Sequence, residues 1–484
     1  MEQCARMSEG GERGGEMAEW QVARLIPTWG ISSDAEAEMR ASSAMLAVLS
    51  IVRDFSSALL TPMGAPTARK ATVESFIEVA FKLNDGTPVR PDGLIRVTYN
   101  KRVFTALVEV KTGKNRLQAE QVNGYWEVAR QFGFDAVITI SNEISVSGRH
   151  PTEGLKFRSK SKVQVHHLSW AQVLSTAVMC KVHRGVDDLE QAWILGELIR
   201  YLECEASGAL SFSDMGPKWV SVRDGARSGT LRKNLPEVKE VVLLWDQLLQ
   251  FAALRLGREI GADVHQTFPR SQSDPKIRSN YLIDSLCDSG RMDGTLKVPN
   301  AVGPITLGAD LRARQVFASV DVPAPMDRGS RARASWLLKQ LGEEAHPTLL
   351  IEEWARNART PIVTTLGAVR ENRELLDDPE GREILRFRLI LRADAGSARA
   401  AGGKTPGFVD SVIDLLDRFY GTVVQGITPW VPKAPRLVPK EPQTPAAPEV
   451  AESRAEVEVA VAEAVEVFSA EAANAEDVGP NDSE

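Results

Sequence analysis

The chain has 484 residues, of which 43% are hydrophobic and 25% are charged. These values are typical of globular proteins, so they exclude a wholly disordered, collagen-like or fibrous protein. The formal net charge is −7, but residues 441–484 alone contribute −11, from 12 acidic residues and one arginine. The rest of the chain therefore carries +4, and this mildly basic body leaves nucleic-acid binding open.

The cysteines and the N-terminal residues indicate the redox state and the compartment of the protein. Cys4, Cys180, Cys204 and Cys287 form no C-x-x-C pair, and His166-His167 has no Cys or carboxylate at a zinc-ligand spacing. We therefore expect reduced thiols. No stretch resembles a signal peptide, and the longest apolar run, residues 44–52, has about half the length that spans a bilayer. These features predict a soluble, cytoplasmic protein without a membrane segment.

The first third of the chain changes its hydrophobic period several times. Residues 1–18 are predicted to be a disordered tail, and residues 33–60 a helix with Ser33 or Asp34 as its N-cap. Residues 76–83, 89–99 and 102–111 alternate like strands. A helix over 115–132, ended by Gly133, precedes a buried strand at 135–140. The predicted order is α-β-β-β-α-β.

The remaining chain is less regular. One more strand is expected at 163–168, with helices at 170–181, 187–205 and 237–256. We expect an α/β domain over 19–185, a helical connection over 186–210, and an accessory α+β region over 211–425, in one domain or two. Seven prolines between residues 429 and 448 indicate a Pro-rich linker over 426–448. An acidic disordered tail is expected over 449–484.

Two acidic residues can be aligned across the predicted hairpin. If Asn100-Lys101 is a symmetric two-residue turn, Asp92 lies directly opposite Glu109, with Cβ atoms about 5 Å apart. A symmetric four-residue turn gives the same pairing, whereas a turn of odd length breaks it. The register therefore decides whether the two carboxylates meet.

Facing carboxylates repel each other unless a cation compensates, and carboxylate oxygens suit Mg²⁺ or Mn²⁺. Lys111 lies two residues past Glu109 and should share its face of the sheet. Glu78 joins that face if the turn after Leu83 has an odd length. The other face is apolar and should pack into a core: Ile95, Val97, Tyr99, Phe104, Ala106, Val108 and Val110.

These residues occur as Pro91-Asp92 and Glu109-Val110-Lys111, and this pattern resembles the defining motif of the PD-(D/E)XK nuclease superfamily. The predicted element order is similar to the core of that superfamily. Gln121 and Tyr125 on the following helix are similar to the Q-x-x-x-Y signature of the RecB-like branch. The resemblance covers about residues 33–168 and implies a restriction-endonuclease-like α/β core.

The resemblance also implies roles for the residues of the motif. Asp92 and Glu109 would bind Mg²⁺ or Mn²⁺, assisted by the backbone carbonyl of Val110. Lys111 would position or activate the attacking water. One metal ion or two are both compatible with a single acidic pair.

The same resemblance implies roles for further residues. Gln121 and Tyr125 would contact the substrate backbone or support the site. Members of the superfamily often have another acid on the first helix, for which Glu36 or Glu38 could serve. In the alternative without a metal, Asp92 and Glu109 belong to a surface hairpin whose ion-pair partners are Arg90 and Lys111.

The resulting expectation is a Mg²⁺- or Mn²⁺-dependent endo- or exonuclease that hydrolyses phosphodiester bonds, in DNA more than in RNA, in repair, restriction or defence. One alternative is a catalytically inactive nuclease fold that acts as a nucleic-acid-binding or regulatory module. Another is an interaction protein whose second domain does the work. A basic stretch could follow a phosphate backbone or be a solvated edge: Lys156, Arg158, Lys160 and Lys162.

Overall fold

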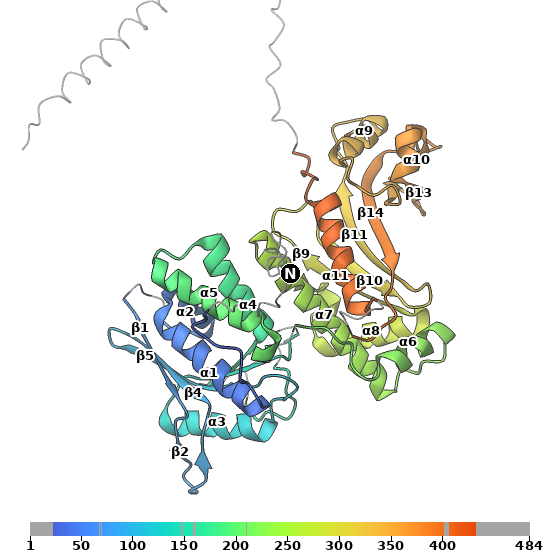
Figure 1. The fold of residues 1–484 in the computed structure, drawn as a ribbon. Helices are drawn as coiled ribbons and strands as arrows, with labels where there is room; N and C mark the ends of the chain where they lie inside the picture. Colours follow the sequence, from blue (N-terminus) through green and yellow to red (C-terminus); the bar gives the residue numbers. More distant parts are fainter. Residues whose placement is uncertain are drawn as a thin grey trace, which may run out of the picture. The chain divides into compact units, whose positions relative to one another are not determined.

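The computed structural model describes residues 23–431, except 67, 69, 147, 149, 158–160, 210 and 401–405. The predicted tails at 1–18 and 449–484 lie outside these residues, as does the predicted linker from residue 432 onward. The described chain is mixed α/β and contains two large sheets and one short ribbon (Figure 1).

The first sheet has five strands in the order β1-β4-β5-β6-β7. Its strands are β1 (Thr72–Ile77), β4 (Gly93–Tyr99), β5 (Arg102–Val110), β6 (Ala136–Ser141) and β7 (Gln164–Ser169). The pairs β1–β4 and β4–β5 are antiparallel, whereas β5, β6 and β7 run parallel. The amino end of β4 and the carboxyl ends of the three parallel strands therefore meet at one edge of the sheet.

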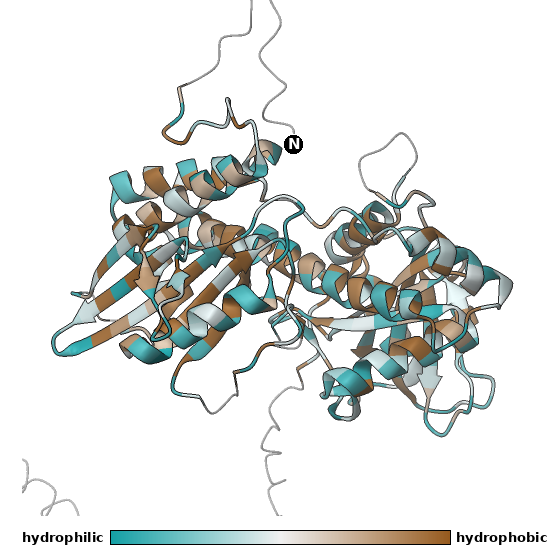
Figure 2. Ribbon diagram, turned by 90° about the horizontal axis from the view of Figure 1, so that it is seen from below, coloured by the Kyte–Doolittle hydropathy of each residue, from teal (hydrophilic) through white to brown (hydrophobic). Residues whose placement is uncertain are grey.

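Helices cover both faces of this sheet (Figure 1). One face packs against α1 (Asp34–Ile51), α2 (Arg53–Leu60), α4 (Trp170–Val178) and α5 (Leu189–Glu203). The other face packs against α3 (Ala119–Phe132). In Figure 2 these strands carry much brown, whereas the helices alternate between brown and teal, as expected for buried strands under amphipathic helices.

Sequence signals locate several helix ends correctly. The hydroxyl of Ser33 accepts a hydrogen bond from the Glu36 amide and caps α1, as predicted. Gly133 ends α3 in the left-handed conformation, with φ +70°. The helix predicted over 33–60 is divided at Val52, which has an extended conformation. The predicted connection over 186–210 supplies α5, whose apolar side chains join the core of the first sheet.

The strand predicted over 76–83 is wrong in its position. The sheet strand is β1, which ends at Ile77, because Glu78 has a left-handed conformation with φ +51°. The Glu78 amide turns to donate to the Asp92 carbonyl at 3.0 Å. The residues beyond it form a separate two-stranded ribbon of β2 (Phe81–Lys82) and β3 (Pro88–Val89).

The second sheet has seven antiparallel strands in the order β13-β12-β14-β11-β10-β9-β8. They are β8 (His265–Thr267), β9 (Arg291–Lys297), β10 (Ile305–Asp310), β11 (Gln315–Pro323), β12 (Leu350–Ala355), β13 (Ile362–Thr365) and β14 (Ile384–Asp394). Apolar residues on one face form a core with the helices. The helices of this part are α6 (Trp219–Ser228), α7 (Pro236–Ile260), α8 (Pro275–Ser289), α9 (Ser330–Gln340), α10 (Leu366–Glu371) and α11 (Phe408–Phe419).

Six short 3₁₀ or π turns complete the described secondary structure: η1 (Thr61–Met63), η2 (Met179–Arg184), η3 (Glu205–Ser207), η4 (Arg270–Gln272), η5 (Arg373–Leu376) and η6 (Tyr420–Val424). Cys180, Cys204 and Cys287 are free thiols, and Cys4 lies outside the described residues. Within the described ranges, no single helix combines the length and the apolar composition needed to cross a bilayer. Of the described segments, α1 taken together with residues 53–63 is the one pair that passes that test, and its two segments are bent by 107°.

Candidate active site

The hairpin of β4 and β5 has the predicted register. Gly93 pairs with Val108, and Tyr99 pairs with Arg102 across the Asn100-Lys101 turn. Asp92 directly precedes β4 and therefore lies opposite Glu109, near the carboxyl end of β5. One Asp92 carboxylate oxygen, Oδ2, accepts the Val110 amide at 2.7 Å. The two acids thus converge at the sheet edge where four strand ends meet.

Glu109 is fully buried, and neither of its carboxylate oxygens accepts a hydrogen bond of acceptable geometry from the described residues. Its Oε1 does lie 2.7 Å from Nζ of Lys111, so an ion pair offsets part of the burial. Burial, and then the negative charge of Asp92, raises the pKa of Glu109 to about 7. Burial also raises the pKa of Asp92. This carboxylate pair is electrostatically unfavourable without a further cation.

Hydrogen bonds hold both the backbone amide and the backbone carbonyl of Lys111. Its amide donates to the Ile140 carbonyl at 2.8 Å, and its carbonyl accepts the Trp170 indole N–H at 2.9 Å. Burial by itself lowers the pKa of Lys111, but the negative charges of Glu109 and its neighbours outweigh that effect and raise the pKa overall. The ammonium therefore stays charged beside the acidic pair.

The structure distinguishes the three candidate extra acids. Glu38 on α1 reaches the site: its Oε2 lies 3.4 Å from Lys111 Nζ, and its Oε1 accepts from Asn115 Nδ2 at 2.6 Å. Glu36 instead pairs with Arg40. Glu78 forms an exposed ion pair with Arg90, so the prediction that it joins the acidic face is wrong. The left-handed turn at Glu78 removes it from the strand alternation on which that prediction depended.

Gln121 and Tyr125 lie on one face of α3, as their spacing predicts. Gln121 Nε2 donates to the Tyr125 hydroxyl at 2.9 Å, and this hydroxyl donates to the Arg90 carbonyl at 3.3 Å. Burial, followed by the charge of Glu109, raises the pKa of Tyr125. The pair therefore buttresses Glu109 and the chain leading into Asp92.

Several residues around the site were not predicted from the sequence to belong to it. Asn115 holds Glu38, and exposed Lys114 and Arg116 flank it in the turn after β5. The only sequence signal for them was a basic, polar turn just past the E-x-K motif. Trp170, which holds the Lys111 carbonyl, is 59 residues away and gave no signal.

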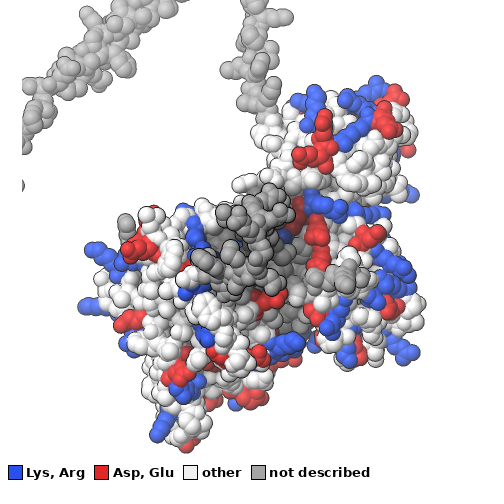
Figure 3. All heavy atoms as spheres, viewed as in Figure 1, with Lys and Arg blue, Asp and Glu red and all other residues white. Residues whose placement is uncertain are grey.

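The predicted basic stretch is described only in part, because Arg158 and Lys160 lie outside the described residues. The Lys156 amide donates to Asn123 Oδ1 at 2.8 Å, which ties this stretch to α3. On the face that Figure 3 shows, Lys and Arg side chains are interspersed with Asp and Glu. The described residues visible on that face therefore form no continuous surface of one charge.

The residues of the site fit a hard divalent cation only in part. Among the described residues, no three His, Cys, Asp or Glu side chains are grouped as a metal site. Mg²⁺, however, is commonly held by one or two carboxylates, with water and substrate phosphate completing its shell. Glu109 Oε2, next to the Asp92 carboxylate, accepts no hydrogen bond of acceptable geometry from the described residues, and a buried acceptor of this kind is one that such an ion satisfies.

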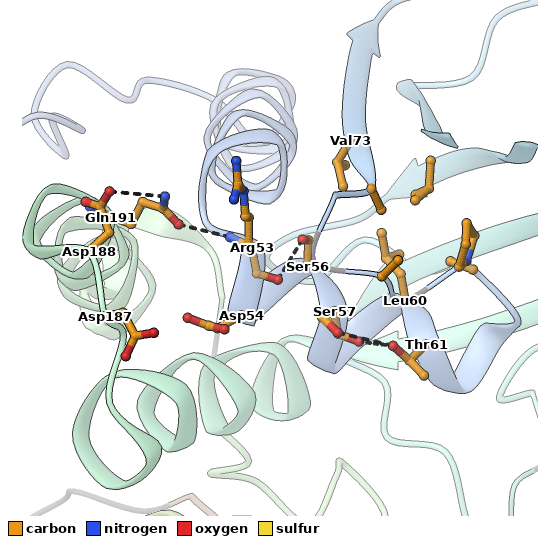
Figure 4. A pocket seen from close by; sticks show the side chains of 15 residues that line it. Arg53, Asp54, Ser56, Ser57, Leu60, Thr61, Val73, Asp187, Asp188 and Gln191 are labelled. Atoms are coloured by element: carbon orange, nitrogen blue, oxygen red, sulfur yellow. Dashed lines mark hydrogen bonds between the residues drawn. The ribbon is translucent and has the colours of Figure 1, made fainter. Parts of the chain in front are cut away.

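A separate pocket of about 430 Å³ opens on the opposite side of the first sheet and contains none of the predicted site residues. In Figure 4, α2 and the start of α5 form its polar side, where the side chains of Asp54 and Asp187 lie near each other. Leu60, Val73 and Val97 supply part of its apolar lining. This pocket does not belong to the acidic site.

Comparison of the chain with protein-family models, with curated proteins and with solved structures finds no match.

Proposed function

We propose that the chain is a metal-dependent nuclease with a restriction-endonuclease-like core, which hydrolyses phosphodiester bonds in DNA. The observation that carries the proposal is the convergence of Asp92, Glu109 and Lys111 at one sheet edge. The buried Glu109 Oε2 accepts no hydrogen bond of acceptable geometry from the described residues. Burying charges without full compensation is costly, so such sites are more common where the charges do chemistry.

In this proposal Asp92 and Glu109, with the Val110 carbonyl, would hold Mg²⁺ or Mn²⁺. A bound ion of this kind neutralises charge on a phosphate and lowers the pKa of a water molecule. Lys111 is fixed through its backbone, so its ammonium can position the attacking water and stabilise negative charge that develops on the phosphate. Tyr125 and Gln121 keep the Glu109 side of the site in place.

Exposed Lys114 and Arg116 next to the site can contact substrate phosphates. The +4 charge of the chain without residues 441–484 favours the same polyanionic substrate. Repair, restriction and defence remain the processes with which such an activity agrees.

The direct test is cleavage of linear, circular and single-stranded DNA with Mn²⁺, comparing wild type with Lys111→Ala. We expect cleavage to fall by at least about 100-fold in the variant, because a charge-stabilising donor is lost, with DNA affinity changed little. Lys101→Ala, in the turn at the far end of the same hairpin, is the matched control. Cleavage at the wild-type rate by Lys111→Ala would remove the catalytic assignment.

A second candidate is a nuclease fold that binds nucleic acid without cutting it. The 2.7 Å ion pair between Lys111 and Glu109 favours it, because the ammonium already compensates part of the charge. Mn²⁺ titration separates the two candidates. The nuclease should bind Mn²⁺ and lose it in Asp92→Asn, which keeps an acceptor for the Val110 amide. Tight DNA binding without Mn²⁺ binding or cleavage would favour the binding module.

A further inference from the structure

Three polar groups that the proposed chemistry does not use lie beside Glu109. In the parallel part of the sheet, Thr139 of β6 pairs with Glu109 on one side and with His167 of β7 on the other. Paired residues in neighbouring strands share a face, so the three form a row. His150 completes the group: its Nε2 and Nδ1 of His167 each lie 2.9 Å from the buried Thr139 hydroxyl oxygen.

Backbone partners at the two ends fix the protons of both imidazoles. The Thr152 amide donates to His150 Nδ1 at 3.1 Å, so this nitrogen is an acceptor and Nε2 carries the proton of the neutral ring. At the other end, His167 Nε2 lies 2.7 Å from the Glu143 carbonyl, which can only accept. His167 therefore carries its proton on Nε2, and its Nδ1 is the acceptor.

The Thr139 hydroxyl joins the two rings. Its oxygen accepts from His150 Nε2–H, and its single proton has two acceptors in reach, His167 Nδ1 at 2.9 Å and the His166 carbonyl at 3.2 Å. A second proton on His150 would face the Thr152 amide, which is another donor. Burial lowers the pKa of both imidazoles to about 4, in agreement with neutral rings. Glu143 lies at the end of this hydrogen-bond chain, and Glu109 lies in the same row of paired residues.

The Glu143 end of this hydrogen-bond chain supports the turn that carries Lys111. The Glu143 carboxylate accepts the Leu117 amide at 3.4 Å. Asn142, the preceding residue, donates from Nδ2 to the Gly113 carbonyl at 2.9 Å. Both contacts hold residues 111–118, the segment in which Asn115 orients Glu38 toward Lys111.

We infer that Thr139, His150 and His167 are positioning residues: a hydrogen-bonded chain of neutral imidazoles, joined by the Thr139 hydroxyl, fixes residues 142–143 against the sheet and thereby holds the Lys111–Leu117 turn. The effect on cleavage rests on the proposed function, whereas the hydrogen-bond chain and its hold on the turn do not. None of the three residues contacts the substrate in this role.

Three variants test the hydrogen-bond chain: Thr139→Val, Thr139→Ser and, as a control in the neighbouring strand, Thr105→Val. In wild type, ¹⁵N-histidine NMR should show His150 and His167 as neutral Nε2–H tautomers between pH 6 and 8. Thr139→Val should change both signals and speed amide exchange in residues 111–118 by about tenfold, whereas Thr139→Ser and Thr105→Val should leave both readouts as in wild type. The proposed hydrogen-bond chain would be overturned by any one of three results. These are Nδ1–H tautomers of the two histidines, titration of either ring near pH 6.5, or an unchanged amide-exchange rate in Thr139→Val.

Cleavage assays test the positioning role separately. Thr139→Val should lower kcat by about tenfold, as loss of a supporting residue around a metal site typically does, with KM unchanged, and Thr139→Ser should restore it. If wild type cleaves DNA and Thr139→Val cleaves equally well, the positioning role is wrong and the nuclease stands. If wild type does not cleave DNA, the proposed function fails. The NMR and amide-exchange results still show whether the hydrogen-bond chain exists.

Discussion

Glu109 and Glu353 are both buried carboxyl groups whose oxygens accept no hydrogen bond of acceptable geometry from the described residues. Burial raises the pKa of each to about 7, and neighbouring acids add to the effect. Their surroundings differ. Glu109 has the Lys111 ammonium at 2.7 Å, whereas near Glu353 the charges of Asp378 and Asp377 outweigh the opposing charge of Arg382. Glu353 is therefore a destabilising charge for which the structure offers no chemical use.

Glu353→Gln should stabilise the protein at pH 8. Since the pKa of Glu353 is raised on folding, the folded state binds its proton more tightly, and the free energy of unfolding falls as pH rises from about 4.5 to about 7. Between these two pH values the loss amounts to about 3 kcal/mol, at roughly 1.4 kcal/mol for each pH unit. Thermal unfolding should show a higher Tm for the variant at pH 8 and nearly equal values at pH 4.5.

Glu352→Gln is the matched control for this prediction, because Glu352 is the preceding residue of β12 and points to the opposite face of the sheet. Its substitution should not produce a gain that appears only above pH 7. An equal gain for Glu353→Gln at both pH values would show that ionisation of the buried carboxyl is not the cause.

Among the elements, the β4–β5 hairpin sets the geometry of the site. Its two-residue turn fixes the register that places Asp92 opposite Glu109. Asn100 in this turn has φ +53°, a left-handed conformation that Gly adopts freely, Asn tolerates and β-branched residues avoid. The identity of one turn residue therefore affects both hairpin stability and the alignment of the acids.

Substitutions at Asn100 should separate these effects. Asn100→Gly should leave the free energy of unfolding within about 0.5 kcal/mol of wild type, whereas Asn100→Val should lower it by about 1–2 kcal/mol through backbone strain. Denaturant unfolding measures both. If Asn100→Val is as stable as Asn100→Gly, the turn does not constrain the hairpin in the way the register requires.

The hairpin was predictable from sequence because alternation, turn length and pairing are local properties. The strands 89–99 and 102–111 were predicted within a few residues of β4 and β5, and the pairing of Asp92 with Glu109 followed from arithmetic. The first strand was misplaced because the left-handed turn at Glu78 has no signature in an alternating pattern.

The surroundings of the site could not be predicted in the same way. Which acid reaches Lys111 depends on how α1 packs on the sheet, and spacing alone did not separate Glu38 from Glu36 or Glu78. Thr139, His150 and His167 meet only through tertiary contacts. The sequence did predict that His166 and His167 point to opposite faces, since they are adjacent in a strand.

At the scale of the whole molecule, charge is divided unevenly between the last 44 residues and the rest of the chain. Residues 441–484 contribute −11 to a net charge of −7, so deleting them leaves a chain of +4. An acidic segment tethered to a basic body competes with polyanions for it, and this competition weakens as salt screens the charges.

Deletion of residues 441–484 should therefore increase affinity for duplex DNA severalfold at low salt, with a smaller gain at 0.3 M salt. Fluorescence anisotropy with a short labelled duplex measures both conditions. A variant that keeps these residues but has their acidic side chains replaced by Gln and Asn should behave like the deletion. Equal affinity of wild type and deletion at low salt would contradict the competition.

The two-residue turn between β4 and β5 also bears on how the first sheet forms during folding. Closing this turn is a short-range event, whereas the parallel pairing of β5 with β6 and the docking of α1 over Lys111 must close longer loops. Asp92 and Glu109 thus meet early in refolding, while water still surrounds them. Their repulsion should slow the metal-free chain at neutral pH, and stopped-flow refolding should accelerate when added salt screens the pair.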